Sequence, residues 1–459
     1  MRRILAWLDD RTGLVSWTRR AMEHPVPPRT GWWYVFGSAT FIAFLLQVVT
    51  GIALATAYVP SSGQAYDSLK FITDQALMGR FLRGLHYFGS SAMVVLIGIH
   101  VARTYLMAAY KFPRELNWLT GAVLLLLTMA LAFTGQLLRW DQTAVWSVIV
   151  GAAQAGRMPV IGDELARFLL AGDAVGGATL SRFFAFHVFF IPAIVFGFVG
   201  LHLMLVLRHG ISERPEKGVR VETATYRQRY NEMLAKEGIP FWPDAAWRDV
   251  VFGAGVVLVI ATLAIAVGPP AVGKPPDPSI LEAYPKPDWY FLWYFAALAF
   301  TPNQWETFVI VVAPMLFGAI LLLVPFFNTG ERSVSLRPWA PLLVVMIVTV
   351  IVAFWAAGER AAWSPDFAAK PLSAAVVRDT APQVVRGAEL FYAKGCEFCH
   401  RIAGEGGERG PDLTNVAGRM TGQEMGLRIT NGGPNMPAYA ATLSTAELQA
   451  LVAFLMTRK

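Results

Sequence analysis

Seven long apolar runs dominate the sequence, and polar segments separate them. The runs cover residues 32–58, 80–109, 117–137, 183–207, 250–268, 306–327 and 339–357. Each reaches the length of about 20 residues that an α-helix needs to cross a bilayer. The pattern therefore predicts seven transmembrane helices, and the expected fold class is an all-α membrane protein.

The composition agrees with this reading and excludes an ordinary soluble protein. Of 459 residues, 55% are hydrophobic and only 15% are charged, and the mean hydropathy is +0.45. The polar segments 1–30, 111–116, 208–248 and 328–337 hold more than twice as many Lys and Arg residues as 59–80, 138–181 and 269–304. By the positive-inside rule the first set is cytoplasmic, and an odd number of spans places everything after residue 358 outside.

The sequence changes character after the seventh run. Residues 358–380 are rich in Ala and Pro and are predicted to be a tether. A small all-α domain should follow, with a first helix at Gln383–Lys394 and a last helix at Ser444–Thr457. The predicted parts are an N-terminal cytoplasmic segment at 1–30, a four-helix membrane domain at 31–210, a three-helix region at 211–357, the tether, and the C-terminal domain at 381–459.

Four of the seven histidines lie inside two of the apolar runs: His86 and His100 in the second, His187 and His202 in the fourth. An ionisable side chain at membrane depth is costly and indicates a function. The two intervals correspond to roughly 21–22 Å of helix, so each pair lies near one helix face at two depths.

The second and fourth spans run in the same direction, because one span separates them. His86 should therefore share the outer depth with His187, and His100 the inner depth with His202. This arrangement predicts two non-covalent haems b, each held between two histidines. The alternative is histidines that only hydrogen-bond within the bundle, which explains two pairs at matched depths less well.

Glycines and arginines support this interpretation. Gly37 and Gly51 in the first span are separated by one histidine interval, as are Gly121 and Gly135 in the third, and missing side chains would let a flat macrocycle approach. The alternative is ordinary small-residue helix packing. Candidate partners of the haem propionates lie near the ends of this region: Arg83, Arg103, Arg114 and Arg182. Some of these arginines could instead only fix helix ends at the interface.

The two cysteines form a motif for a third haem. Cys396-Glu397-Phe398-Cys399-His400 matches the C-x-x-C-H pattern of covalent haem c attachment, in which His400 is an axial ligand of the iron. Met436 is the favoured ligand on the other side, and Met420 and Met425 are the competitors. A zinc site would need two more Cys or His ligands, and a thioredoxin-like site would need a βαβ pattern.

Together these residues resemble cytochrome b of the Rieske/cytochrome b complexes, which are quinol:cytochrome c oxidoreductases, with a class I cytochrome c fused at the C-terminus. The likeness is greatest to the chloroplast-type and Gram-positive branch. The stretches that carry it are Phe112-Pro113-Arg114-Glu115-Leu116, Trp140-Asp141-Gln142, Pro159-Val160-Ile161-Gly162 and Gly210-Ile211-Ser212. The resemblance implies a seven-helix cytochrome b core and a small cytochrome c domain.

The resemblance also implies an outer quinol-oxidising site. The family's Pro-Glu-Trp-Tyr sequence corresponds here to Pro287-Asp288-Trp289-Tyr290, so Asp288 would take a proton from quinol and Tyr290 would hydrogen-bond its head group. Asp288 is one methylene shorter than the family's glutamate. The alternative is an aromatic loop that only marks the membrane interface.

Three further places compare less simply with the family. Arg139 stands where the family usually has proline. Tyr34-Val35-Phe36 occupies the place of the cysteine that attaches an extra haem in chloroplast-type proteins, so no such haem is expected to be covalently attached. Arg208 and Asp249 resemble residues of the family's inner quinone site, but they could equally be interface anchors at the cytoplasmic surface.

The function that the resemblance implies is bifurcated quinol oxidation with proton translocation across a bacterial inner membrane. One electron would pass to a Rieske centre and the haem c, and the other across the two haems b. The chain lacks a Cys/His set for the Rieske cluster, so a separate iron–sulfur subunit, a homodimeric core and a downstream acceptor are expected, and no nucleic acid. The quinone could be menaquinone, ubiquinone or plastoquinone.

Two other functions are compatible with parts of the pattern. A membrane-anchor cytochrome could pass electrons between the quinone pool and a periplasmic partner without bifurcation, but it needs neither the Pro-Asp-Trp-Tyr loop nor a fused haem c. A non-catalytic electron carrier held by an inert bundle would need no stacked histidine pairs.

Overall fold

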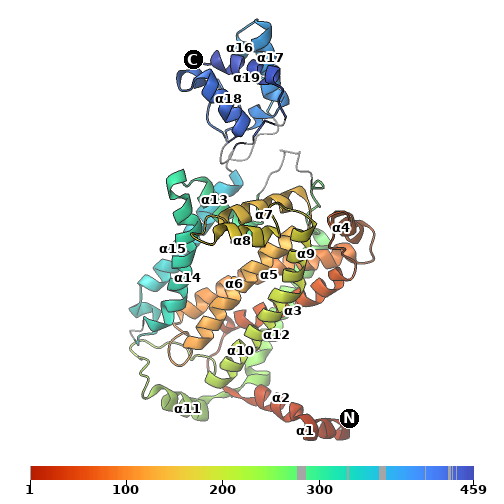
Figure 1. Cartoon of the computed structure of the whole chain (residues 1–459). Helices are drawn as coiled ribbons and strands as arrows, with labels where there is room; N and C mark the ends of the chain where they lie inside the picture. Colours follow the sequence, from red (N-terminus) through yellow and green to blue (C-terminus); the bar gives the residue numbers. More distant parts are fainter. Residues whose placement is uncertain are drawn as a thin grey trace. The chain divides into compact units, whose positions relative to one another are not determined.

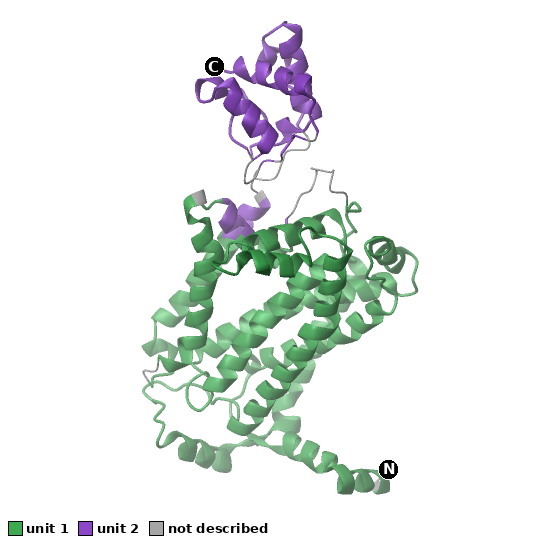
Figure 2. Ribbon diagram, viewed as in Figure 1, with its two compact units in different colours: residues 1–276, 287–294, 300–353 green, residues 277–286, 295–299, 354–459 purple. Residues whose placement is uncertain are grey.

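The computed structural model describes residues 2–276, 286–327, 330–360, 369–408, 410–432, 436, 438–440 and 442–459. The chain forms two compact units (Figure 2). The membrane unit contains residues 1–276, 287–294 and 300–353, and the C-terminal unit contains 277–286, 295–299 and 354–459. Residues 361–368 of the predicted tether lie outside the described residues.

Seven helices among the described residues are long and apolar enough to cross a membrane, as the hydrophobic pattern predicts. They are α3 (Phe36–Ala55), α5 (Gly79–Leu106), α6 (Glu115–Leu137), α9 to α10 (Gly177–His209), η3 to α12 (Phe241–Ala266), η5 to η6 (Phe308–Phe326) and α15 (Trp339–Arg360). Only 6–28% of their most apolar windows is buried inside the protein. Their remaining apolar surface therefore fits a lipid environment.

Small residues let these helices approach closely. Ala39 and Ala43 of α3 are fully buried and belong to one core cluster with Met93 of α5. On the other side of α5, a Cβ at Gly84 would lie 2.9 Å from the Cβ of Ala264 in α12. Helices in a membrane associate through such close packing, because lipid is as apolar as their side chains.

A π-helical turn, η2 (Phe186–Phe190), joins α9 (Gly177–Ala185) to α10 (Ile191–His209) and contains His187. A π turn accommodates one additional residue within a helix. The interval from His187 to His202 is one residue longer than the interval from His86 to His100. The extra residue is therefore taken up by the π turn, so that His187 and His202 can lie at the same two depths as His86 and His100 of the regular helix α5.

Shorter helices cover the two ends of the membrane-spanning helices, and the sequence analysis did not anticipate them. At one end lie α4 (Ala65–Asp74), α7 (Gln142–Ala155) and α8 (Gly162–Leu170) (Figure 1). At the other end lie α1 (Arg2–Thr12), α2 (Leu14–Glu23) and α11 (Tyr226–Glu237) (Figure 1). The predicted polar N-terminal segment is thus a pair of helices with exposed Trp7 and Trp17. A two-stranded sheet pairs β1 (Pro25–Val26) with β2 (Ile239–Pro240).

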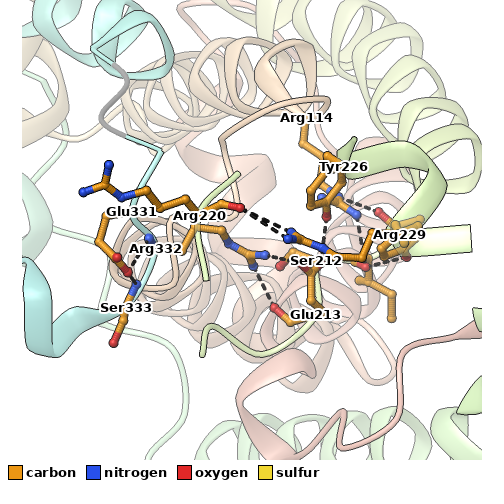
Figure 3. A network of polar contacts seen from close by, with 12 residues as sticks. Arg114, Ser212, Glu213, Arg220, Tyr226, Arg229, Glu331, Arg332 and Ser333 are labelled. Atoms are coloured by element: carbon orange, nitrogen blue, oxygen red, sulfur yellow. Dashed lines mark hydrogen bonds and ion pairs between the residues drawn. The ribbon is translucent and has the colours of Figure 1, made fainter. Parts of the chain in front are cut away.

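A network of ionic and hydrogen-bonding side chains joins the four-helix domain to the three-helix region (Figure 3). Arg332, only 4% exposed, donates from Nη1 to Glu213 Oε1 over 2.6 Å and from Nη2 to the Glu213 carbonyl over 2.7 Å. The Tyr226 hydroxyl donates to Glu213 Oε2 and accepts from Arg114 Nη1, both over 2.7 Å. Buried charges need such partners, because removing them from water is costly.

The C-terminal unit is a small helical domain, as predicted. It contains α16 (Ala374–Val377), α17 (Pro382–Ala393), α18 (Gly422–Asn431), α19 (Thr445–Met456) and the strands β3 (Arg401–Ile402) and β4 (Glu405–Gly406). The predicted first and last helices are confirmed to within one residue at each end. Ser444 and Glu447 form the capping box of α19, and a Cβ at Gly387 of α17 would lie 2.1 Å from the Ala450 carbonyl oxygen. These two helices therefore pack backbone to backbone.

The remaining described elements are α13 (Trp289–Ala299), α14 (Ala313–Leu323) and several short helical turns. The turns are η1 (Trp32–Tyr34), η4 (Asn303–Trp305), η7 (Val334–Leu336), η8 (Cys396–Phe398) and η9 (Val416–Gly418).

Replacing Glu213 by glutamine should destabilise the membrane unit in a pH-dependent way. Burial alone would raise the pKa of Glu213, but the Arg332 cation and the Tyr226 hydroxyl outweigh it and hold that pKa below its ordinary value of 4.5. This stabilisation is present above pH 4.5 and is lost as the pH falls through the lowered pKa. At pH 7 we expect Glu213→Gln to cost about 2–3 kcal/mol, at the low end for a buried pair because Glu213 is partly exposed.

Thermal unfolding of the detergent-solubilised protein at pH 7 and near pH 4 would measure this effect. The gap between wild type and Glu213→Gln should narrow in acid. Glu222→Gln is the matched control, because this exposed carboxylate accepts a hydrogen bond from Thr225 and has no ion pair among the described residues. A gap of the same size at both pH values would contradict the role assigned to Glu213.

Candidate functional site

The outer pair of histidines meets in the middle of the helix bundle. The rings of His86, in α5, and His187, in η2, have centroids 6.2 Å apart and planes at 79°. Metal–imidazole bonds of roughly 2.0–2.1 Å on each side match this separation when the metal lies between the two rings. The geometry fits one iron held between these side chains.

The inner pair faces a common cavity. His100 of α5 and His202 of α10 line it together with Arg103, Gly121 and Trp118. Each predicted pair is therefore brought together at its own depth along the same two helices.

Threonine hydroxyls orient three of the four imidazoles, and the sequence analysis missed them. The Nδ1 atoms of His86, His202 and His187 lie 2.9, 2.9 and 3.2 Å from three threonine Oγ1 atoms. These threonines are Thr50, Thr120 and Thr134, in the same order. Each hydroxyl donates its one proton to a carbonyl of its own helix. It can therefore only accept from Nδ1–H, which leaves Nε2 free to bind a metal.

The predicted glycines lie directly against the histidine rings. A Cβ at Gly135 would lie 2.6 Å from Cε1 of His187, and one at Gly37 would lie 3.0 Å from Cε1 of His100. At Gly51 and Gly121 the corresponding distances to His86 and His202 are 3.2 and 3.5 Å. Three of these glycines directly follow the threonines just described, so a recurrent Thr-Gly pair is the signal that could have revealed both roles.

The predicted propionate partners divide into two groups. Arg103 is 9% exposed and lies 3.9 Å from the Tyr34 ring centroid, and its Nε and Nη2 have no hydrogen-bond partner among the described residues. Because it lines the inner cavity, a buried cation with unused donors suits an anionic group there. Arg83, 7% exposed, donates to Thr73 Oγ1 over 3.1 Å near the outer pair.

The other two arginines have hydrogen-bond partners within the protein, and their role toward a propionate stays a prediction. Arg114 donates to the Gly210 and His209 carbonyls and to the Tyr226 hydroxyl, and it also lines the cavity of His100 and His202. Arg182 donates to the Phe168 carbonyl and lies over the Phe168 ring. The sequence alone does not show where a long, flexible guanidinium will find its acceptor.

Asp288 and Tyr290 lie together at the start of α13. The Tyr290 hydroxyl donates to Asp288 Oδ2 over 3.0 Å. Tyr290 is 8% exposed, whereas the Asp288 side chain is 18% exposed. Burial, and then the negative charge of Asp288, raise the pKa of Tyr290 well above its ordinary value of 10. The phenol therefore remains a hydrogen-bond donor at neutral pH.

The two candidate residues of the inner quinone site lie on different helices. Asp249 accepts from the Ser38 hydroxyl at the start of α12, and Arg208 is exposed at the end of α10. Within the described ranges, no hydrogen bond or ion pair joins Arg208 to Asp249. Their common role stays a prediction.

The C-terminal unit arranges the C-x-x-C-H segment around a short helical turn. Cys396 and Cys399 form no disulfide, and burial raises the pKa of the Cys396 thiol to about 12. The Nδ1–H of His400 donates to the Pro411 carbonyl over 2.8 Å, which leaves Nε2 available to iron. Met436 and its competitor Met420 pack against the edge of the core that contains Met425, and Asn435 and Pro437 lie outside the described residues.

Comparison with known proteins agrees with these observations. Residues 21–210 match the family described as cytochrome b/b6/petB, and residues 279–377 match cytochrome b(C-terminal)/b6/petD. Residues 382–455 match cytochrome c oxidase, cbb3-type, subunit III. The chain also resembles a solved hyperthermophilic respiratory Complex III, with a TM-score of 0.66, 24% identity, and coverage of 86% of this chain and 96% of that one; this likeness shows the fold.

Relatives match most of the membrane unit. Cytochrome b of Allochromatium vinosum is 33% identical over 368 residues, which cover 76% of this chain and 87% of that protein. Cytochrome b of Rhodobacter capsulatus is 32% identical, with coverage of 75% and 82%. The menaquinol:cytochrome c reductase cytochrome b subunit of Bacillus subtilis is 37% identical over 221 residues, or 46% of this chain and 98% of that protein.

Replacing Thr134 by valine should weaken haem binding at the outer pair only. His187 would lose the Thr134 hydroxyl and keep only the backbone of Leu131 as an acceptor, and changes to such supporting groups typically cost 10–100-fold in metal affinity. Reduced-minus-oxidised spectra and haem extraction would measure the occupancy of each b-type component. Thr128→Val is the matched control, because Thr128 on the same helix donates only to the Leu124 carbonyl. Equal spectra in the two variants would contradict the role of Thr134.

Replacing Gly135 by alanine should also remove the outer component. The added methyl group would lie 2.6 Å from Cε1 of the His187 ring, so the ring would have to leave its position. Gly197→Ala in α10, where a Cβ meets nothing within 4 Å, should leave both components intact and favour the helix by up to about 1 kcal/mol. Two unchanged b-type bands in Gly135→Ala would show that this glycine does not limit the site.

Proposed function

The chain belongs to the cytochrome b/b6 family, and from this we propose that it is the cytochrome b/c subunit of a proton-translocating quinol:cytochrome c oxidoreductase. The observation that carries the proposal is the stacking of two histidine pairs along α5 and η2–α10, next to an outer carboxylate–phenol pair. A metal chain through the bundle and an outer proton acceptor are the two parts that quinol oxidation coupled to transmembrane electron transfer requires.

The four membrane histidines would hold two haems b, which supply a one-electron relay when bound. His86 and His187 would hold the outer iron and His100 and His202 the inner one. The threonine hydroxyls accept from Nδ1–H and so keep Nε2 unprotonated, and the glycines leave room beside the imidazole rings. Arg103 and Arg83 would compensate carboxylate charge at the two depths.

Asp288 and Tyr290 would handle the proton of the quinol. Asp288 would accept a proton from a quinol hydroxyl, and Tyr290 would stay protonated and orient the carboxylate or the head group. Each quinol releases two protons and two electrons. One electron would go to a Rieske iron–sulfur centre and the other inward through the bundle to a quinone on the cytoplasmic side.

The C-terminal unit would carry the first electron onward. Cys396 and Cys399 would attach a haem c through thioether bonds, with His400 and Met436 as axial ligands. The tether predicted at 358–380 would keep this acceptor at a high effective concentration beside the iron–sulfur partner. A downstream soluble or membrane-bound acceptor would then receive the electron.

The partners follow from what the chain lacks and from its relatives. Both cysteines lie in one motif, and the described residues contain no group of three or more His, Cys, Asp or Glu that could hold a metal ion. The Rieske centre therefore belongs to another subunit, and a homodimeric core in a bacterial inner membrane is proposed, with the N-terminus cytoplasmic. The relatives include cytochrome b of Allochromatium vinosum beside the subunit of Bacillus subtilis, so the comparisons do not confirm the predicted branch.

Replacing Asp288 by asparagine tests the proposal. Asparagine keeps the size of the side chain but cannot take a proton, so quinol-dependent cytochrome c reduction should fall by roughly 10²-fold or more. Spectra should keep two b-type components and one c-type component. Inhibition of the wild type by an outer-site quinol analogue completes the test. Full activity in Asp288→Asn, or insensitivity to the analogue with intact haems, would instead favour a membrane-anchor cytochrome.

A further inference from the structure

Arg139 forms the only described link between the α6–α7 loop and the Asp288 carboxylate, and the proposed function does not use it. Its Nε lies 3.7 Å from Asp141 Oδ2, and its Nη1 lies 3.9 Å from Asp288 Oδ1. The Arg139 side chain is 22% exposed, so this cation is mostly withdrawn from water. A guanidinium in such a place is expected to interact with carboxylates.

Asp141 is a fixed support for this arginine. Its Oδ1 accepts from the Ala144 backbone N–H over 2.9 Å and caps α7, and its Oδ2 accepts from Gly273 N–H over 3.2 Å. The Asp141 side chain is 3% exposed. Because two segments hold this carboxylate in place, it presents a fixed negative charge 3.7 Å from Arg139 Nε, while Nη1 of the same guanidinium faces Asp288.

Each oxygen of the Asp288 carboxylate therefore has a neighbouring polar group. One carboxylate oxygen faces Arg139, and the other accepts from the Tyr290 hydroxyl. Among the described residues, Tyr87 and Arg83 of α5 are further titratable groups that interact with this centre. Arg139 is the cation that forms an ion pair with Asp288 in that part of the chain, and Asp141 also accepts from two backbone N–H groups.

We propose that Arg139 is a positioning residue for the Asp288 carboxylate in quinol deprotonation, and this inference rests on the proposed function. The chain differs from the family's usual sequence at two places that the structure brings together, the arginine at 139 and the shorter aspartate at 288. The short side chain has less reach, and the guanidinium holds it in one orientation. The quinol hydroxyl proton then passes to Asp288 while the electron leaves for the iron–sulfur acceptor of the partner subunit.

A double-mutant cycle between Arg139 and Asp288 tests the proposal in the membrane-bound complex. Arg139→Gln should lower kcat for quinol-dependent cytochrome c reduction by roughly 10-fold, with a smaller change in KM, because the base is misplaced and not removed. Arg139→Lys should recover part of the loss. In an Asp288→Asn background, Arg139→Gln should have no further effect, because the residue that it positions is already inactive.

Three controls separate this role from a structural one. Both b-type components must persist in Arg139→Gln. Asp141→Asn, which keeps an acceptor for the α7 cap, should lower kcat less than Arg139→Gln. The double variant Arg139→Pro with Asp288→Glu, which restores the family's usual residues, should be more active than either single variant.

The outcomes distinguish failure of this inference from failure of the proposed function. If Asp288→Asn itself is fully active, the proposed proton acceptor is wrong. If Asp288→Asn is inactive but Arg139→Gln is normal, or lowers kcat equally in both backgrounds, Arg139 does not act through Asp288. If Arg139→Gln loses a b-type component or fails to assemble, and both Arg139→Lys and the double variant show no recovery, the arginine serves the fold or the haem and the inference is overturned.

Discussion

Four imidazoles inside an apolar bundle are the constraint on which the rest of the membrane unit depends. A neutral imidazole carries one donor and one acceptor, and neither can be left unpaired in a medium without water. Threonine hydroxyls satisfy the donor in three of the four rings. The acceptor nitrogen is left for a metal. The sequences of α3 and α6 therefore match the histidines on α5, η2 and α10. In each Thr-Gly pair, the threonine accepts a hydrogen bond from a histidine, and the glycine leaves space for the same ring.

Charged groups at the ends of the bundle obey the same rule. At the inner end, Arg332 and Arg114 are buried and reach Glu213, Tyr226 and backbone carbonyls, and this network joins the four-helix domain to the three-helix region. At the outer end, Arg139 lies between two aspartates. Arg103 satisfies the rule least, because two of its donors have no hydrogen-bond partner in the part of the chain that the structure describes, whereas Arg139 and Arg332 each have one such donor. Buried donors of this kind beside a histidine pair agree with the predicted anionic ligand.

The features that the sequence pattern did not predict have identifiable physical causes. Helices α4, α7 and α8 were expected only as loops. These helices are short, so their apolar residues do not reach the length that predicts a membrane span. The threonines were missed because a hydroxyl in a membrane helix usually bonds only to its own backbone. The hydrogen bonds from Arg114 to the Gly210 carbonyl and the Tyr226 hydroxyl could not be predicted, because these acceptors are far from Arg114 in the sequence.

The sequence by itself determined the number of membrane helices, the two depths of the histidines, and the capped helix at the C-terminus, because these depend on periodicity and spacing within single segments. Only the tertiary structure decided how the longer histidine interval comes into register, through the π-helical turn at His187. It also decided which hydroxyl meets each ring and that Arg139 meets Asp288. Those features depend on contacts between segments far apart in the chain, and no local pattern encodes them.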